Sequence, residues 1–97
     1  MIEALQIDWH VTPMRAERFV ERYLPAVSRV LAYGATGYVF MRVDEDSHHF
    51  IHVSYWEDRA DFDRYWFSNE MRAVRMNIAG LHEQPVLPHW NAVIEKR

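Results

Sequence analysis

The chain opens with alternating apolar and polar residues, a pattern that predicts a β-strand. Within residues 2–11 the side chains of Leu5, Ile7 and Trp9 fall on one face, and the polar side chains between them fall on the other. This segment is therefore expected to be the first strand, with one face suited to a core.

Three later segments also have the composition of strands. Residues 38–43 and 49–56 are rich in β-branched and aromatic side chains, and the polar residues 44–47 between them predict a hairpin turn. Residues 90–95 follow a proline-bracketed segment and are expected to form the last strand.

Apolar residues at helical spacing predict a helix over residues 13–33. Thr12 is expected to cap this helix and Pro13 to take its first position, where proline fits well. Pro25 lies inside the pattern, so the helix should kink or divide there. Gly34 is expected to end it.

A second helix is expected to begin after Asp58, whose side chain can cap it. Asp61 adds a negative charge at the positive end of that helix. The apolar stripe then continues to residue 78, with a break near Ser68 and Asn69. Gly80 is expected to close the segment.

The predicted order is therefore strand, helix, strand, strand, helix, strand. Short connections and right-handed crossovers favour a single α+β domain over residues 1–97, with a four-stranded antiparallel sheet and both helices on one face. The other face of the sheet would then be uncovered. A homodimer that packs two such open faces together is the simplest way to cover it.

Composition and charge exclude several classes of partner. Hydrophobic residues make up 49% of the 97 residues, which is enough for a packed core. The formal net charge is −3 and basic residues interleave with acids, which argues against nucleic acid or an anionic membrane surface as a partner. The chain has no cysteine, which excludes disulfides and thiolate metal sites. No leader or membrane span is recognisable, so a cytoplasmic location is expected.

The sequence resembles a known family in two places. Residues 53–58 read Val-Ser-Tyr-Trp-Glu-Asp and are followed by Ala-Asp-Phe at 60–62, Trp66 and Ser68. Together with Gly-Ala-Thr-Gly at 34–37, this pattern is similar to that of antibiotic-biosynthesis-monooxygenase-like proteins of the ferredoxin-like, dimeric α+β barrel superfamily. The resemblance implies a homodimer and a small hydrophobic pocket in each subunit, between the helices and the sheet.

That family implies small-molecule chemistry of several kinds. Its members include cofactor-independent oxygenases of aromatic polyketides and quinols, haem-degrading oxygenases, and relatives that act as cyclases or isomerases. The first hypothesis is therefore a cofactor-independent monooxygenase acting on an electron-rich aromatic compound, with no cofactor required. The alternatives are a polyketide cyclase or isomerase on the same scaffold, or a non-catalytic dimer that binds a small hydrophobic or aromatic ligand.

Four side chains are the candidates for catalysis. His52 is the candidate general base, because an imidazole titrates near neutral pH. Tyr65, Trp66 and Arg75 are the candidates for positioning a planar substrate and stabilising its oxyanion. The residues expected to contact the substrate are Trp9, Phe40, Phe62, Met71 and Arg72.

No metal or haem site is expected from the sequence. His48 and His52 share a face but lie roughly 13 Å apart along a strand, too far for one ion. A site drawing on His52 and His10 from adjacent strands stays open as an alternative. The haem-degrading branch of the family uses an Asn, a Trp and a His for haem. Alignment places Ile7, Tyr65 and Arg75 at those three positions of this sequence, so the same mode of haem binding is not expected. Asp8 and His10 share a strand face, and their expected role is in the interface between sheets.

Overall fold

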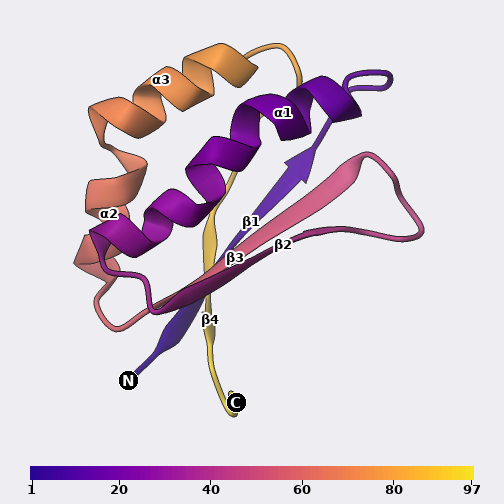
Figure 1. Ribbon diagram of the computed structural model, residues 1–97. Helices are drawn as coiled ribbons and strands as arrows, with labels where there is room; N and C mark the ends of the chain where they lie inside the picture. Colours follow the sequence, from indigo (N-terminus) through magenta and orange to yellow (C-terminus); the bar gives the residue numbers. More distant parts are fainter.

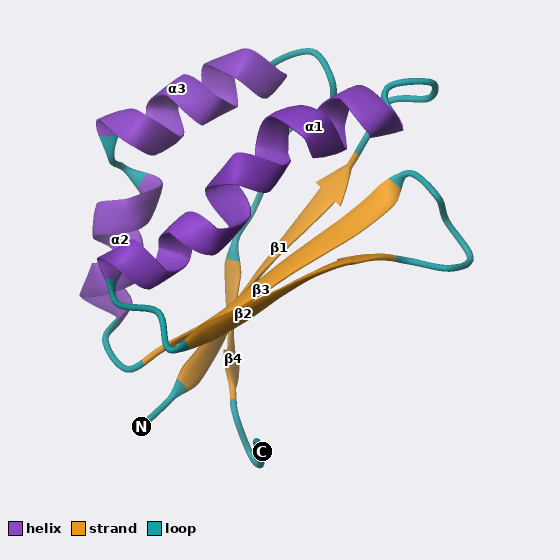
Figure 2. Ribbon diagram, viewed as in Figure 1, coloured by secondary structure: helices purple, strands orange, loops and turns teal.

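The computed structural model describes residues 1–97, which form one antiparallel sheet with helices against a single face (Figures 1 and 2). The strand order in the sheet is β2-β3-β1-β4. The elements are β1 (Glu3–His10), α1 (Ala16–Val27), the 3-10 helix η1 (Ser28–Tyr33), β2 (Gly37–Arg42), β3 (His49–Trp56), α2 (Arg59–Trp66), α3 (Asn69–Ile78) and β4 (His89–Ala92). The predicted α+β class and the ferredoxin-like βαββαβ order are confirmed.

The strand β1 lies in the middle of the sheet and pairs with β3 on one side and β4 on the other. In this register Ile7 lies opposite His52, and Trp9 lies opposite Phe50. All four side chains are buried against the helices. The alternation predicted for the first strand is therefore confirmed, and it supplies the floor of the core.

Aromatic rings fill the space between the sheet and α1. The Trp9 ring lies 4.9 Å from that of Tyr23 and 5.4 Å from that of Phe19, measured between centroids. Phe19 in turn contacts Phe50 across the layer. These packed rings fix how α1 crosses the sheet, because large side chains contribute most of the buried area in a small core.

The first helix begins later than the sequence predicts. Thr12 does not cap it: the Thr12 hydroxyl donates instead to the carbonyl of Leu81, 3.1 Å away. Met14 then adopts a positive φ of 68°, so the chain turns before the helix begins at Ala16. The expected helical position of Pro13 was therefore wrong, because a contact with a distant segment holds Thr12.

The end of the first helix follows the prediction more closely. Pro25 lies within α1, and the helix changes to the 3-10 form at Ser28. Gly34 ends η1 with a φ of 117°, a conformation that favours glycine.

The second helical segment is divided where the sequence predicts. The Asp58 carboxylate caps α2 by accepting from the backbone N–H of Ala60, 2.9 Å away. The Ser68 hydroxyl caps α3 by accepting from the N–H of Met71 at 3.1 Å. Both contacts satisfy backbone donors that the first turn of a helix leaves free. Gly80 follows α3 in a positive-φ conformation.

The strand bounds differ slightly from those predicted. β2 spans Gly37–Arg42, one residue earlier than expected, and β4 spans only His89–Ala92 instead of residues 90–95. β4 pairs with the first half of β1 alone, so its pairing ends where that partner begins at Glu3.

The face of the sheet opposite the helices is divided into two halves. Five side chains of β2 and β3 form an apolar half, here called the apolar stripe. Its members are Val39, Met41, Ile51, Val53 and Tyr55. The other half, on β1 and β4, carries polar side chains that include Gln6, Asp8, His10, His89 and Asn91.

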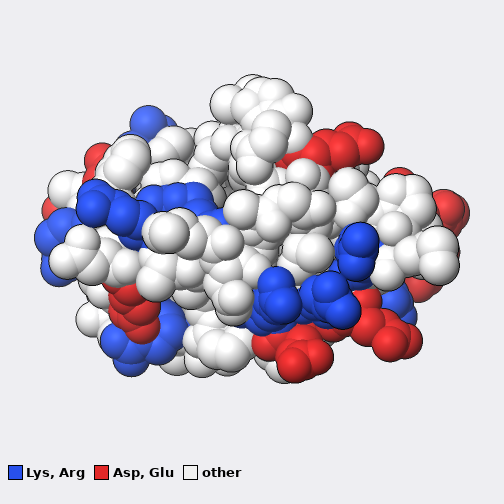
Figure 3. Space-filling model, turned by 90° about the horizontal axis from the view of Figure 1, so that it is seen from above, with Lys and Arg blue, Asp and Glu red and all other residues white.

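Charges of both signs are mixed on the surface. Figure 3 shows, on the face seen from above, that Lys and Arg side chains lie beside Asp and Glu side chains rather than in a patch of one sign. Three of the resulting ion pairs join Arg29 to Glu70, Arg59 to Glu3, and Arg64 to Asp61. None of the helices is long and apolar enough to span a bilayer.

Candidate functional site

The candidate base His52 lies beneath α1 and touches Tyr23. Its side chain is 1% exposed, and its Nδ1 shares a hydrogen bond with the Tyr23 hydroxyl at 2.7 Å. Its Nε2 is buried and has no hydrogen-bond partner. Burial lowers the pKa of His52 to about 4, although the nearby backbone carbonyl of Val27 opposes this shift in part. The imidazole is therefore neutral at neutral pH, and it lines none of the cavities.

A small cavity brings together three of the predicted site residues. It has a volume of about 190 Å³ and lies between the second helical segment, the end of β1 and the segment that follows α3; we call it the tryptophan cavity. It is lined by Trp9, Trp66, Arg75, His82, Gln84, Pro85 and Val86. Its volume is below the range of about 300–1,000 Å³ typical of drug-sized ligands, so it suits a compact ring compound.

Arg75 and Trp66 form one wall of the tryptophan cavity. The Arg75 guanidinium lies 4.8 Å from the centre of a Trp66 ring, in the position of a cation–π contact. It also donates to the backbone carbonyl of Trp66 at 2.6 Å, which fixes it at the C-terminal end of α2. Burial and the neighbouring Arg72 lower the pKa of Arg75, but a guanidinium remains a cation at neutral pH.

His82 forms the opposite wall and is held in one orientation. Its Nδ1 lies 2.9 Å from the carbonyl of Glu83, and because a carbonyl only accepts, this nitrogen carries the proton and donates. Nε2 is therefore unprotonated, and it accepts a long hydrogen bond of 3.4 Å from the Gln84 amide N–H. The side chain is 8% exposed. An imidazole oriented in this way is the usual arrangement of a general base.

The third wall is the ring of Trp9, which links the cavity to the core. Its centroid lies 4.9 Å from that of His82 and 6.5 Å from that of Trp66. The buried Trp9 indole N–H makes no hydrogen bond. An unpaired donor of this kind is uncommon in a protein interior. Burial raises the pKa of Tyr23 well above its usual value.

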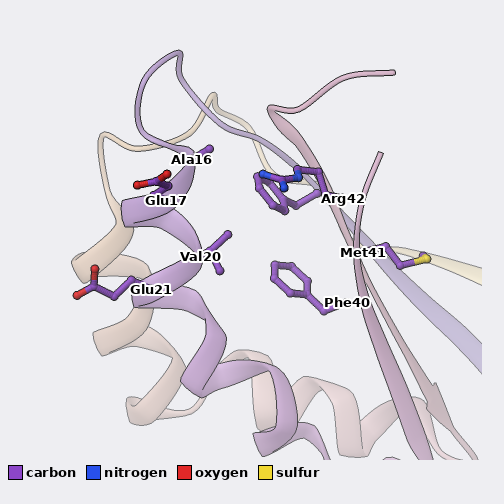
Figure 4. A pocket seen from close by; sticks show the side chains of 8 residues that line it. Ala16, Glu17, Val20, Glu21, Phe40, Met41 and Arg42 are labelled. Carbon is purple, nitrogen blue, oxygen red and sulfur yellow. The ribbon is translucent and has the colours of Figure 1, made fainter. Parts of the chain in front are cut away.

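A larger groove of about 540 Å³ lies between the start of α1 and β2. Figure 4 shows Val20 of α1 and Phe40 of β2 pointing toward one another across this α1–β2 groove, whereas Glu21 and Met41 point away. Arg42 lies over the Phe50 ring, 5.8 Å from its centre. The groove is therefore mostly apolar inside and has no imidazole or other base pointing into it.

The remaining predicted site residues lie elsewhere. Tyr65 is fully buried and its hydroxyl donates to the carbonyl of Ala26 at 3.0 Å. Phe62 and Met71 belong to the hydrophobic core and line no cavity. Arg72 is exposed on α3, and Phe40 lines the α1–β2 groove rather than the tryptophan cavity.

Sequence reasoning missed His82. This residue follows Gly80 in a segment without secondary structure, and it reaches the site through a single β-bridge between Val11 and His82. The backbone N–H of Glu83 also donates to the carbonyl of His10 at 2.7 Å. The sequence signal available was a histidine flanked by Leu81 and Glu83 immediately after a helix stop, which is weak by itself.

The chain is a small α+β domain with a cavity of about 190 Å³ between its helices and its sheet. The sequence matches the family model described as antibiotic biosynthesis monooxygenase over residues 4–76. The chain therefore belongs to the antibiotic biosynthesis monooxygenase family, and the resemblance seen in the sequence is confirmed. No curated protein matches the sequence.

Solved structures share the fold over almost the whole chain. A protein from Nitrosomonas europaea that carries the family's name is 13% identical, has a TM-score of 0.86, and is matched over 96% of this chain and 90% of its own. A Mycobacterium tuberculosis protein is 13% identical with a TM-score of 0.83, over 99% and 98%. A Bordetella bronchiseptica protein with the family's name is 17% identical with a TM-score of 0.82, over 97% and 98%. At such identities the likeness establishes the fold alone.

Proposed function

We propose that this protein is a cofactor-independent monooxygenase that oxidises a small electron-rich aromatic compound, of the polyketide or quinol type, in the tryptophan cavity. One observation carries the proposal: the cavity brings an arginine cation, an imidazole with an unprotonated Nε2 and two indole rings to one compact hollow. Family membership supports the reaction class.

The chemistry needs a base, an oxyanion partner and an apolar enclosure. In the proposed reaction Nε2 of His82 takes the acidic proton of the substrate, and the electron pair stays on the substrate as a phenolate or enolate. Arg75 stabilises the negative oxygen. Dioxygen, the co-substrate, accepts electrons from this anion. One of its oxygen atoms enters the product, and the other leaves as water, which takes up the proton held by His82 and a second hydrogen lost by the oxidised carbon of the substrate.

His52 is the second candidate for the base. Its unpaired Nε2 supports the assignment, but its low pKa makes it a weak proton acceptor at neutral pH, and burial keeps it from the cavity. His82, in contrast, lies on the wall of the cavity. His82 is therefore the proposed general base, and the experiment below compares it with His52.

Oxygen uptake with anthrone-like and hydroquinone substrates tests the proposal. The unmodified protein is expected to consume oxygen without added flavin or metal. His82→Ala should reduce the rate about 10²- to 10⁴-fold, the usual contribution of general base catalysis. Arg75→Met should reduce it about 10²- to 10³-fold through loss of oxyanion stabilisation.

Two further variants act as controls. Arg72→Met removes an exposed cation from the same helix and should leave the rate unchanged. His52→Asn should also leave the rate within a few-fold, whereas a large loss in His52→Asn together with a normal rate in His82→Ala would transfer the role of base to His52. If the protein consumes no oxygen with any of these substrates but converts one of them anaerobically, the cyclase or isomerase alternative replaces the proposal.

The proposal includes a homodimer formed through the open sheet face. The apolar stripe leaves Val39 37% and Met41 42% exposed, with Ile51, Val53 and Tyr55 beside them. Contiguous apolar surface of this kind on a sheet is typical of a protein interface. A second copy of the same stripe would cover it, because an interface around a two-fold axis uses one surface on both subunits.

A further inference from the structure

Three potential metal ligands come together on the open face of the sheet. They are Asp8 and His10 of β1 and His49 of β3, and one ligand atom from each lies within 4.8 Å of the others. The closest pair is Oδ2 of Asp8 and Nε2 of His49, at 3.1 Å. The imidazole rings of His10 and His49 are stacked, with their centroids 4.4 Å apart and their planes inclined by 30°.

Strand register produces this cluster. His10 and His49 are direct partners across the β1–β3 ladder. Asp8 is two residues before His10 on the same strand, so its side chain leaves the sheet on the same face. Side chains directly opposite each other, and their diagonal neighbours, are the ones that can reach a common point above a sheet.

We propose that Asp8, His10 and His49 form a binding site for a divalent transition-metal ion, with Zn²⁺ as the best match. Two imidazoles and a carboxylate are ligands that zinc commonly uses, at about 2.0–2.2 Å each. In tetrahedral geometry those bond lengths place ligand atoms roughly 3.3 Å apart. One pair of ligand atoms in the cluster lies 3.1 Å apart and all three lie within 4.8 Å of one another, a range that includes this value. Small side-chain rotations would therefore complete the site.

The surroundings of the cluster favour a cation. The Gln6 amide donates to the second carboxylate oxygen of Asp8 at 2.8 Å and so orients the first one toward His49. Such a hydrogen bond to the far side of a ligand is typical of metal sites. Burial opposes ionisation of Asp8, but the contacts with Gln6 and His49 outweigh it and leave the pKa of Asp8 below its usual value. The carboxylate is therefore charged at neutral pH.

An ion pair between Asp8 and His49 would not by itself explain the position of His10. A dication bound by both imidazoles and the carboxylate would account for the positions of all three side chains. Three protein ligands also leave a coordination position free for water or another ligand atom. In the single chain Asp8 and His49 keep 30% and 21% of their side chains exposed, and they lie on the polar half of the open face, beside the apolar stripe that the proposed homodimer covers.

Titration of the untagged protein with Zn²⁺, followed by calorimetry at pH 7.5, tests this site. One ion is expected to bind per chain, and His10→Ala and His49→Ala should each weaken binding at least tenfold. Binding should also weaken as the pH is lowered through the range in which imidazole protonates. His48→Ala is the matched control, since His48 neighbours His49 in sequence but lies outside the cluster, and it should bind as the unmodified protein does.

Two measurements keep the test decisive. Thermal unfolding of each variant without metal should be unchanged, because the substituted side chains are partly exposed on the sheet surface. Sedimentation of the same samples with a chelator separates metal binding from any effect of these residues on subunit association. Absence of Zn²⁺ binding at micromolar concentrations would overturn the proposal, and so would unaltered binding in either His10→Ala or His49→Ala.

Discussion

The hydroxyl oxygen of Tyr23 lies 2.7 Å from Nδ1 of His52, in a part of the core that excludes solvent. Tyr23 belongs to α1 and His52 to β3, so this hydrogen bond joins the helical layer to the sheet. The aromatic rings of Phe40 and Trp9 surround the pair. The arrangement keeps the imidazole neutral, with its pKa lowered to about 4.

The buried His52 should make stability depend on pH. Its pKa is about 6.5 when unfolded and about 4 when folded, so between these values the unfolded chain binds a proton that the folded chain does not. The stability that comes from keeping His52 neutral is fully present above pH 6.5. As the pH falls toward 4, the free energy of unfolding should decrease by up to about 3 kcal/mol. Urea unfolding at several pH values measures this loss.

His52→Asn supplies the control for that titration. Asparagine can retain a hydrogen bond to Tyr23 but does not titrate, so the variant should lose less stability between pH 6.5 and 4 than the unmodified protein does. Carboxylates contribute equally to both proteins and cancel in the comparison. Identical slopes for the two proteins would contradict the neutral state assigned to His52.

Gly34→Ala should destabilise the protein, because alanine is incompatible with the backbone conformation at this position. Gly34 has a φ of 117°, and a Cβ there would lie 2.7 Å from Oδ2 of Asp61. Backbone strain and the clash together should cost about 1–3 kcal/mol in the free energy of unfolding. Gly37→Ala is the control, since its added Cβ would be 3.7 Å from Tyr55, an ordinary contact. Thermal unfolding should therefore separate the two variants, and equal melting temperatures would refute the argument.

Local features of the fold were predictable from the sequence. The strand at His49–Trp56, the cap at Asp58, the break near Ser68 and the stop at Gly34 all depend on residues close in sequence. The start of the first helix was not predictable in this way, because the Thr12 hydroxyl donates a hydrogen bond to the carbonyl of Leu81, far along the chain. Tertiary contacts override local preference in such cases.

The candidate sites were harder to predict for the same reason. Trp9, Trp66 and Arg75, all named from the sequence, line one cavity, and their roles in binding or catalysis stay predictions. His82 and the pairing of His10 with His49 depend on strand register and on one bridge, which spacing along the chain does not reveal.

Met71→Ala should lower stability without altering the tryptophan cavity. Met71 is fully buried in the core and lines no cavity, so its truncation should cost about 2–5 kcal/mol in the free energy of unfolding. Met76→Ala, at a position 75% exposed on the same helix, should change it by less than about 0.5 kcal/mol. Denaturant unfolding compares the two variants. A marked rise in the KM of the Met71→Ala variant, measured under conditions in which the variant is folded, would instead support the predicted contact between Met71 and the substrate.

Val53→Lys should dissociate the proposed homodimer. Val53 lies in the centre of the apolar stripe, between Val39 on β2 and Gln6 on β1, so a lysine there would be buried against the second subunit without a partner. An unpaired buried charge should weaken the dimer by at least about 100-fold in its dissociation constant. Sedimentation over a range of concentrations measures this shift.

Met76→Lys is the matched control for the dimer, because it adds the same charge on α3, the helical side of the molecule. It should sediment as the unmodified protein does. The tryptophan cavity lies on that helical side as well, so a monomeric Val53→Lys protein is expected to keep its ligand affinity. Two results would contradict the proposed dimer: the unmodified protein sedimenting as a monomer at tens of micromolar, or the Val53→Lys variant sedimenting like the unmodified protein. In either case the apolar stripe does not bind a second copy, and another partner must cover it.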